Sequence, residues 1–390
     1  MVFLLTLAFI FSWVGHACIW TSILNNFYGR PWPKIFLRMW RYTTALILIA
    51  FPLLPMQIVA SDFEAFYAGR PYGFAYYAIL TYLPICLIFG AVIFPCITLA
   101  RLLRKVPTCL LTQQTRTLDL WPELGEQLVG DNKRAAMTRI PFNGVFRVDF
   151  TDLTLALSEL PAEWDGLTLL VLSDLHFHGS PSRIFFERII EELGRGATPD
   201  LVCLLGDYVD SDHHLDWIPL LLGRLQAKGA KLAILGNHDL LHHPENVRKK
   251  LEEAGYLVIG NGCHQLTIRG VPCLAIGHEG PWFRPGPDLA SAPAGLFRLC
   301  LSHTPDNYYW GQVNKIGLML CGHVHGGAIR IPLIGPIFVP SVYGRRFDCG
   351  VFEGNGTTMV VSRGISGREP LRFRCNPQVI RLTLRLRAVL

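Results

Sequence analysis

Five short polar motifs, each placed directly after a run of apolar residues, constrain the fold of this chain more than any other feature. They are Asp174-Leu175-His176, Asp207 with Asp210, Asn237-His238-Asp239, His303, and His323-Val324-His325. Continuous apolar runs of this length predict strands that are buried on both faces. Ligands gather outside the carboxyl ends of strands in α/β sheets, so we expect the five motifs to converge on one site.

The sequence around these motifs predicts an α/β domain over residues 145–390. Strands 167–174, 200–207 and 231–239 alternate with helices over 183–196 and 215–229, which is the pattern of βαβαβ. The later part is rich in strands, at 266–270, 273–277, 297–303, 317–323, 357–364 and 381–389. We therefore expect two packed sheets with helices on the outside.

The residue types in the motifs are those of a dinuclear metal site. Imidazoles and carboxylates suit zinc, iron and manganese. Twelve of the 13 histidines lie between His176 and His325. Asp174 and His176 are two residues apart and can share one ion, whereas His323 and His325 can reach one ion each. The remaining histidines are expected at the rim of the site (His178, His213, His214, His242, His243 and His278) or in a structural role (His264).

The first hundred residues predict a membrane anchor. Hydrophobic residues make up 51% of the chain and charged residues only 17%, and residues 1–24, 42–60 and 71–100 carry no charge. A bilayer core needs about 20 helical residues, so each run is long enough or nearly so. A buried core or a signal peptide explains three such runs in succession less well than three spans do.

The charges between the runs predict the orientation of the anchor. Residues 25–41 hold four basic and no acidic residues, residues 61–70 hold Asp62 and Glu64, and basic residues follow the third run. Basic loops stay in the cytoplasm, which places the catalytic domain there and the protein in the cell (inner) membrane. The 11 cysteines agree, because several lie in apolar strands as buried thiols. Residues 101–144 are expected to be a linker, with a short surface helix over 112–128.

The motifs D-x-H, G-D-x-x-D, G-N-H-D, S-H and G-H-x-H, in this order, resemble the calcineurin-like metallophosphoesterase superfamily. The stretches LPAEWDGLTLLVLSDLH, GHVHGGAIRIPLIGP and SRGISGREPLRF are similar to a membrane-associated bacterial subgroup related to phosphodiesterases and UDP-diacylglucosamine hydrolases. The resemblance implies a four-layer α/β/β/α sandwich behind a three-helix transmembrane anchor. The chain departs from the subgroup at Val324, at Ala328 and around Glu279, which bears on the substrate and not on the ligands.

The resemblance also implies a role for each motif residue. Two divalent ions (manganese, zinc or iron) would be held, the first by Asp174, His176 and His325, the second by Asn237, His303 and His323, and both by a bridging Asp207. His238 would be a general acid that is not a ligand, with Asp239 orienting it. Asp210 would support the site through hydrogen bonds.

These residues predict hydrolysis of a phosphomonoester, phosphodiester or pyrophosphate by a water that bridges two cations. The anchor favours a lipid-linked or nucleotide-activated lipid substrate. One alternative is a phosphodiesterase for soluble cyclic nucleotides or nucleic acid, but basic stretches are confined to the loops beside the apolar runs, so no nucleic acid is expected. The other is a membrane metal-binding scaffold without activity, which would need a lost ligand. Arg330, Arg345, Arg346 and Arg363 are candidates for phosphate binding, although each is more simply explained as surface.

Overall fold

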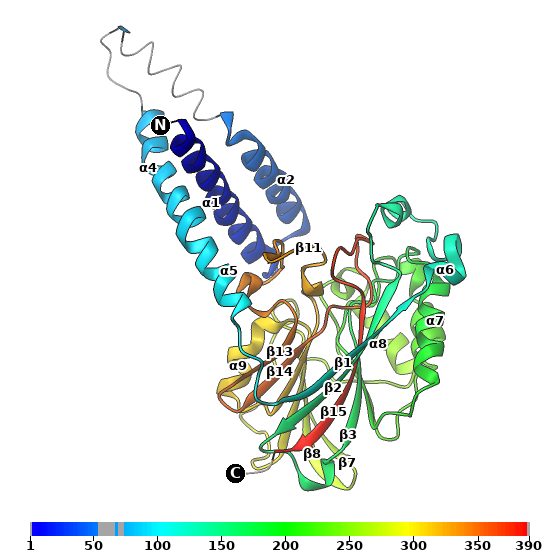
Figure 1. Ribbon diagram of the computed structural model, residues 1–390. Helices are drawn as coiled ribbons and strands as arrows, with labels where there is room; N and C mark the ends of the chain where they lie inside the picture. The colour runs from blue at the N-terminus through cyan, green and yellow to red at the C-terminus, as the bar shows by residue number, and fades with distance from the viewer. Residues whose placement is uncertain (1, 54–66, 69–73, 388–390) are drawn as a thin grey trace. The chain divides into compact units, whose positions relative to one another are not determined.

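The computed structural model describes residues 2–53, 67–68 and 74–387 of the 390-residue chain. The chain divides into two compact units (Figure 1). Unit 1 comprises Met1–Lys105 together with Pro332–Gly344, and unit 2 comprises Val106–Ile331 together with Arg345–Leu390. A short segment from late in the sequence therefore belongs to the N-terminal unit.

Unit 1 is helical. Its elements are α1 (Val2–Tyr28), α2 (Lys34–Ala50), α4 (Phe74–Ile88), a π-helical turn η1 (Phe89–Ile93), α5 (Phe94–Leu102) and the short strand β12 (Gly335–Pro336). Gly15 of α1 and Gly90 of η1 allow the helices to touch: a Cβ at Gly15 would lie 1.8 Å from the carbonyl oxygen of Cys86. Small residues permit this close approach in apolar helix pairs.

In the described part of unit 1, two helices are long and apolar enough to cross a membrane, Val2–Tyr28 and Tyr77–Leu102. The predicted third span, 42–60, is described only as far as residue 53, because residues 54–60 lie outside the described residues. The predicted outer loop 61–70 also lies outside them, apart from residues 67 and 68. Two of the three expected spans are therefore seen as long apolar helices.

Unit 2 contains two sheets, of seven and six strands among its described residues. The larger has the order β1 (Leu110–Asp119), β2 (Arg147–Leu157), β15 (Gln378–Leu386), β3 (Leu167–Leu172), β4 (Leu201–Leu204), β5 (Lys231–Ala233), β6 (Leu257–Val258). The smaller has the order β13 (Gly350–Gly354), β14 (Thr357–Val361), β10 (Leu318–Cys321), β9 (Phe297–Ser302), β8 (Val271–His278), β7 (Cys263–Ile268). The short strand β11 (Arg330–Ile331) also belongs to this unit.

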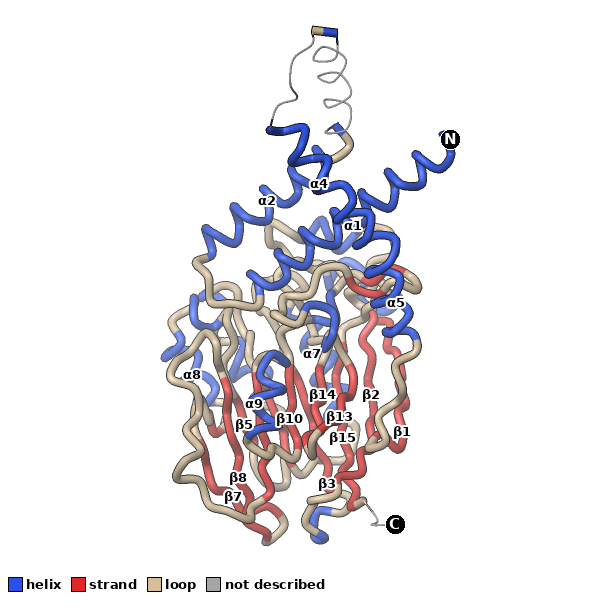
Figure 2. Tube along the Cα trace, turned by 90° about the vertical axis from the view of Figure 1, so that its left-hand side faces the viewer, coloured by secondary structure: helices blue, strands red, loops and turns tan. Residues whose placement is uncertain are grey.

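Two hydrophobic cores hold the layers of unit 2 together. In β3, Leu167, Leu169 and Val171 join the core that packs the two sheets against each other. Leu170 and Leu172 face the other way, into a core shared with the helices. The helices of this unit are α6 (Trp121–Leu124), α7 (Arg183–Gly194), α8 (Pro244–Glu253) and α9 (Tyr308–Val313), and α7 and α9 lie on opposite sides of the paired sheets (Figures 1 and 2). The predicted mixed α/β fold with two packed sheets is confirmed.

Two segments differ from the prediction. The expected helix over 215–229 is reduced to a single π-helical turn, η6 (Ile218–Leu222), since Pro219 lacks an N–H and Gly223 follows directly. Within the expected linker 101–144, residues 110–119 form β1, which pairs antiparallel with β2. The surface helix expected over 112–128 is thus largely a strand, and only short helical turns follow it.

Candidate metal centre

The five polar motifs meet where strands of both sheets end. The strands β3, β4 and β5 are parallel neighbours in the larger sheet, and β9 and β10 are parallel neighbours in the smaller one. Among the described residues, three groups bring side-chain ligand atoms within 4.8 Å of one another: Asp174, His176 and His325; Asp207, His303 and His323; His176, Asp210 and His238. The expected convergence of the motifs is therefore present in the fold.

The backbone at these motifs is bent into an unusual conformation. Asp174, His176, Asp207, His323 and His325 all have φ between 47° and 70°, in the left-handed region that residues with a side chain seldom adopt. Such conformations cost about 1–3 kcal/mol each and cluster at functional sites, where the surrounding structure holds them. These backbone turns allow alternate side chains of a short motif to point toward the same metal centre.

The carboxylate of Asp207 lies at the middle of the centre. Its Oδ2 is 3.6 Å from Nε2 of His176 and 3.5 Å from Nε2 of His303. Nε2 of His303 is also 3.0 Å from Oδ1 of Asn237. On the other side, Nε2 of His325 is 3.3 Å from Nε2 of His176 and 3.7 Å from Oδ1 of Asp174. One oxygen of Asp207 thus lies between two sets of donors.

Three imidazoles are oriented by a partner on their Nδ1 atom. Nδ1 of His303 lies 2.7 Å from the carbonyl oxygen of Leu205, and Nδ1 of His325 lies 3.1 Å from that of Ser366. Nδ1 of His176 lies 3.1 Å from Oδ2 of Asp210. A hydrogen bond on one ring nitrogen selects the tautomer that leaves the other for a metal. All three rings therefore present Nε2 to the centre.

Of the two acidic residues beside His238, Asp210 supports the site through hydrogen bonds as predicted, whereas Asp239 has a different role. The ring of His238 is hydrogen-bonded through Nδ1 to Asp210, whose other oxygen binds His176. The carboxylate of Asp239 instead accepts backbone N–H groups of Asp207, Tyr208 and Gly236, each at 2.8 Å. The prediction that Asp239 orients His238 is therefore wrong: Asp239 shapes the backbone, and Asp210 orients the imidazole.

Burial and charge oppose each other in this centre. Burial alone would lower the pKa of His176 and His303, but the neighbouring carboxylates outweigh it and raise the pKa of each to about 9. Burial acts to raise the pKa of Asp207, yet the imidazoles of His303, His238 and His176 hold it well below its usual range. Protons therefore occupy lone pairs that a cation needs, so metal binding here competes with protonation.

The exposure of the side chains shows where the centre opens. Asp174, His176, Asp207 and His303 are at most 1% exposed, whereas His238 is 17% and His325 is 19% exposed. A group arriving from solvent therefore meets His238 and His325 first.

Trp282 is a neighbour of the centre that the sequence did not reveal. Its ring lies 4.6 Å from that of His323 and 5.4 Å from that of His303. The same stretch, noted as a departure from the subgroup, contains the buried Glu279, which accepts the backbone N–H of Leu235 at 2.7 Å. Glu279 is in turn paired with Arg248 at 2.7 Å. The stretch GHEGPW thus supports the Asn237 loop and covers two imidazoles.

A second residue that was not predicted is Arg372, in the stretch SRGISGREPLRF. Its buried guanidinium donates to the carbonyl oxygens of His325 at 3.1 Å and Arg363 at 2.7 Å, and also to Ser366. It therefore fixes the loop that carries His325. Two of the arginines considered for phosphate are in ion pairs instead: Arg330 with Asp348 and Arg363 with Asp149.

The other histidines are not uniformly at a rim. His213 and His243 are exposed, whereas His178 and His278 are buried. Nδ1 of His278 accepts the N–H of Gly280 at 3.2 Å and the amide of Asn307 at 3.1 Å. His278 is therefore a structural residue, contrary to the prediction.

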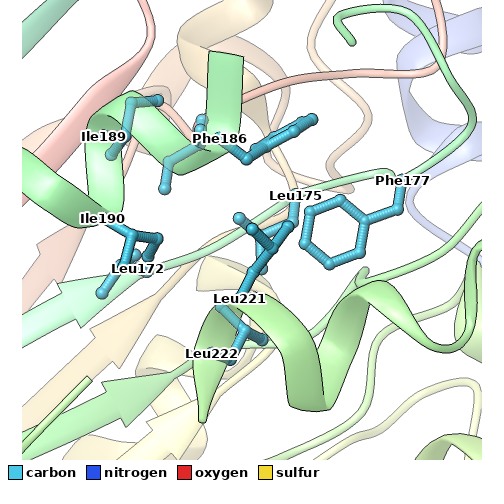
Figure 3. A pocket seen from close by; sticks show the side chains of 9 residues that line it. Leu172, Leu175, Phe177, Phe186, Ile189, Ile190, Leu221 and Leu222 are labelled. Atoms are coloured by element: carbon cyan, nitrogen blue, oxygen red, sulfur yellow. The ribbon is translucent and has the colours of Figure 1, made fainter. Parts of the chain in front are cut away.

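The alternation of side chains after β3 separates the centre from the core. Leu175 and Phe177, which alternate with Asp174 and His176, line a small apolar cavity with Phe186 and Leu221 (Figure 3). All nine residues that line this cavity are hydrophobic, so it offers no group to bind a phosphate. It belongs to the packing of the larger sheet against α7 and η6.

Comparisons with known proteins agree with this geometry. The family model of the calcineurin-like phosphoesterases matches residues 167–327, which include every motif residue of the centre. The metallophosphoesterase YkuE of Bacillus subtilis is 32% identical over 248 residues, which is 61% of this chain and 86% of that protein. The phosphodiesterase YaeI of Escherichia coli is 31% identical over 224 residues, covering 55% and 81% respectively. A transmembrane protein with a metallophosphoesterase domain from Danio rerio is 24% identical over 264 residues, covering 60% and 56%.

Proposed function

Since this chain belongs to the calcineurin-like phosphoesterase family, we propose that it hydrolyses phosphate esters with two divalent cations, acting at a membrane. The observation that carries the proposal is the position of Oδ2 of Asp207, between Nε2 of His176 and Nε2 of His303. An anionic oxygen between two sets of imidazole and carboxylate donors suits a ligand that bridges two cations.

The geometry supports an assignment of ligands to each cation. Asp174, His176 and His325 form one side of Asp207, and His303, His323 and Asn237 form the other. The backbone N–H of His323 donates to both oxygens of Asp174, at 3.0 and 3.1 Å, which holds that carboxylate in place. Manganese, zinc and iron are all compatible with these nitrogen and oxygen donors.

A pair of divalent cations supplies an activated water and stabilises charge on the phosphoryl group. The residues of the chain position the other participants. His238 stands at the opening with Nδ1 bonded to Asp210, so its Nε2 is the atom that can give a proton to a leaving oxygen. Asp210 also holds His176, and it therefore fixes the acid relative to a ligand.

Two features of unit 1 support action at a membrane. Val2–Tyr28 and Tyr77–Leu102 are long and apolar, and most of their side chains are not buried within the protein. The carboxyl-terminal ends of both lie on one side, because each contacts the segment Pro332–Gly344, through Asn25 and Arg101 respectively. Two spans that run in the same direction require the chain between them to cross back, which supports the predicted third span, 42–60, of which the structure describes residues 42–53.

The charges support a cytoplasmic catalytic unit in the cell membrane. Arg30 follows α1, and Arg104 and Lys105 follow α5, so the shared end of the two helices is basic. A membrane anchor raises the effective concentration of an enzyme toward substrates in the same bilayer. We therefore propose a lipid-linked or nucleotide-activated lipid phosphoester as the substrate.

Metal removal and replacement of the bridging carboxylate test the proposal together. The purified chain should lose activity on a nitrophenyl phosphodiester in chelator and regain it with manganese, zinc or iron. Asp207→Asn should be nearly inactive and bind less metal, whereas Asp152→Asn, on an exposed position of β2, should match the unmodified chain. Full activity of the metal-free protein would exclude the two-cation mechanism. Metal binding without hydrolysis of any ester would favour the alternative of a metal-binding scaffold without activity.

A panel of esters then separates the substrates. We expect a lipid-linked pyrophosphate or phosphodiester in vesicles to be cleaved with a higher kcat/KM than cyclic nucleotides or short nucleic acids. The reverse order would favour the soluble-substrate alternative.

A further inference from the structure

We propose that residues 332–344, here called the interfacial segment, lie in the headgroup layer of the bilayer and contact lipid directly. The inference rests on the proposed membrane anchoring and extends it to a part of the chain far from the apolar helices in sequence. The segment, PLIGPIFVPSVYG, contains no charged residue. It is grouped with the helices of unit 1 and not with the catalytic unit on either side of it.

Specific hydrogen bonds attach the segment to the end of α1. The side chain of Asn25, which is 3% exposed, donates through Nδ2 to the carbonyl oxygen of Ile337 at 3.2 Å. The N–H of Val339 donates to Oδ1 of the same side chain at 3.0 Å. The side-chain amide of Asn25 thus pairs with one backbone carbonyl and one backbone N–H of the segment. The ring of Tyr28 meets that of Phe338 edge to face, with centroids 5.2 Å apart.

Close packing extends the attachment to the second apolar helix. A Cβ at Gly29, directly after α1, would lie 2.6 Å from the backbone nitrogen of Val342. A Cβ at Gly335 would lie 2.8 Å from Nε of Arg101, in α5. The interfacial segment therefore touches the ends of both helices that are long enough to cross a membrane. If these helices span the bilayer as proposed, the segment lies at the end where both leave it.

The side chains that the segment exposes suit lipid. Leu333 is 77% exposed, Ile337 is 46% and Phe338 is 38% exposed. Apolar side chains gathered on a surface mark an interaction site. Trp and Tyr are enriched where spans meet the headgroups, and Tyr343 of the segment is 38% exposed. Arg104 and Lys105 follow α5 at the same end, where they favour anionic headgroups. Continuity with the spans makes a lipid surface the occupant, in preference to a protein partner.

The position of the segment in the sequence connects it to the proposed ligands. Pro332 follows His325 by seven residues. Before the segment, Arg330 donates to the carbonyl oxygen of Gly326 and to Asp348, each at 2.7 Å, and Asp348 lies in the chain just after the segment. The chain thus leaves the loop of His325, reaches the end of the anchor and returns to a residue tied to the same loop.

Photocrosslinking in the full-length chain tests the inference without any activity measurement. The photoreactive residue p-benzoyl-phenylalanine is placed at position 333 and the protein is reconstituted in vesicles of phosphatidylcholine and phosphatidylglycerol. Val92, 54% exposed within a candidate span, is the positive control. Val313, 82% exposed in the catalytic unit, is the matched control for exposure. The measurement is the yield of lipid adduct by mass spectrometry after illumination.

We expect adducts at positions 92 and 333, with a yield at 313 at least several-fold lower. An adduct at 92 without one at 333 would overturn the inference and leave the anchor intact. Equal yields at 313 and 333 would also overturn it, because contact with lipid would then not be specific to the segment. No adduct at 92 would contradict the membrane anchoring itself, and this inference with it.

Discussion

At the scale of single residues, one carboxylate connects binding and proton transfer. Asp210 holds Nδ1 of His176 through one oxygen and Nδ1 of His238 through the other. Burial acts to raise the pKa of Asp210, but the imidazoles of His238 and His176 outweigh it and keep the pKa well below the usual range. An ionised Asp210 therefore favours a proton on each Nδ1, which frees Nε2 of both rings for their separate tasks.

If His238 is the proton donor, the effect of replacing it should depend on how basic the leaving group of the ester is. A nitrophenolate leaves as an anion without help, whereas an alkoxide needs a proton. General acid catalysis contributes about 10²–10⁴-fold, so His238→Ala should lower kcat/KM by that order on an alkyl ester and far less on a nitrophenyl ester. The measurement is kcat/KM for both esters with metal content determined in each protein.

His323→Ala is the matched comparison, because it removes an imidazole of the same centre that we propose as a ligand. This variant should hydrolyse both esters far more slowly and should bind less metal. If His238→Ala lowers kcat/KM equally for both esters, or if the variant loses metal, then His238 is a ligand or a packing residue and not a general acid.

The buried His278 predicts how stability depends on pH. Burial lowers its pKa from 6.5 to about 4. Below pH 6.5 His278 is protonated in the unfolded chain, but in the folded chain it stays neutral until about pH 4. The folded state therefore loses stability as pH falls from 6.5 to about 4. The loss between pH 7 and pH 5 should be about 2 kcal/mol. Urea midpoints at the two values measure it, and His278→Asn should show a smaller difference than the unmodified chain; an equal difference would assign the effect to other groups.

At the scale of elements, the segment before the catalytic motifs is part of the folded unit. The strand β1 pairs with β2 from Leu110 to Asp119, and Leu120, Leu128 and Val129 are buried in the core shared with α7. An expectation based on motifs alone places the boundary near residue 145, which would remove this edge strand and its core residues.

Two truncations test that boundary. A chain that begins at Val106 should fold and cleave a soluble phosphodiester. A chain that begins at Val145 should be insoluble or unstable, because losing Leu120 and Leu128 alone forfeits about 1.5–3 kcal/mol of burial for each side chain. Circular dichroism melts and nitrophenyl ester hydrolysis compare the two. Equal stability of both chains would show that residues 106–144 contribute nothing to the fold.

At the scale of the whole molecule, the helices of unit 1 predict a topology. Both long apolar helices end on one basic side, so reporters fused after Leu390 should report the cytoplasm and a fusion near Glu64 should report the outside. Paired alkaline phosphatase and fluorescent protein fusions at each position measure this. A phosphatase signal after Leu390 would reverse the orientation and remove the support from the basic loops.

Much of the centre could be predicted from the sequence because its information is local. Apolar runs that end in Asp, Asn or His specify both a buried strand and the polar group at its end, and the order of the motifs needs no knowledge of packing. The apolar helices are predictable for the same reason, because the length of a run without charged residues is enough to indicate a membrane-spanning helix. The candidate positions therefore follow from short stretches, whereas the family resemblance implied the role of each ligand; Asp207 and His303 lie together with His323, and Asp174 lies with His176 and His325.

Only the tertiary structure decided which side chain orients which. Asp239 is the sequence neighbour of His238, yet it accepts the backbone N–H of Asp207, and the ring of His238 binds Asp210, 28 residues away in the sequence. Trp282 and Arg372 reach the centre from loops remote in sequence; their stretches were singled out by the resemblance, but no local pattern gave either residue a role. The segment Pro332–Gly344 belongs with the helices of unit 1 through the hydrogen bonds of Asn25, a contact across more than 300 residues. Such contacts depend on long-range packing, which composition and periodicity do not encode.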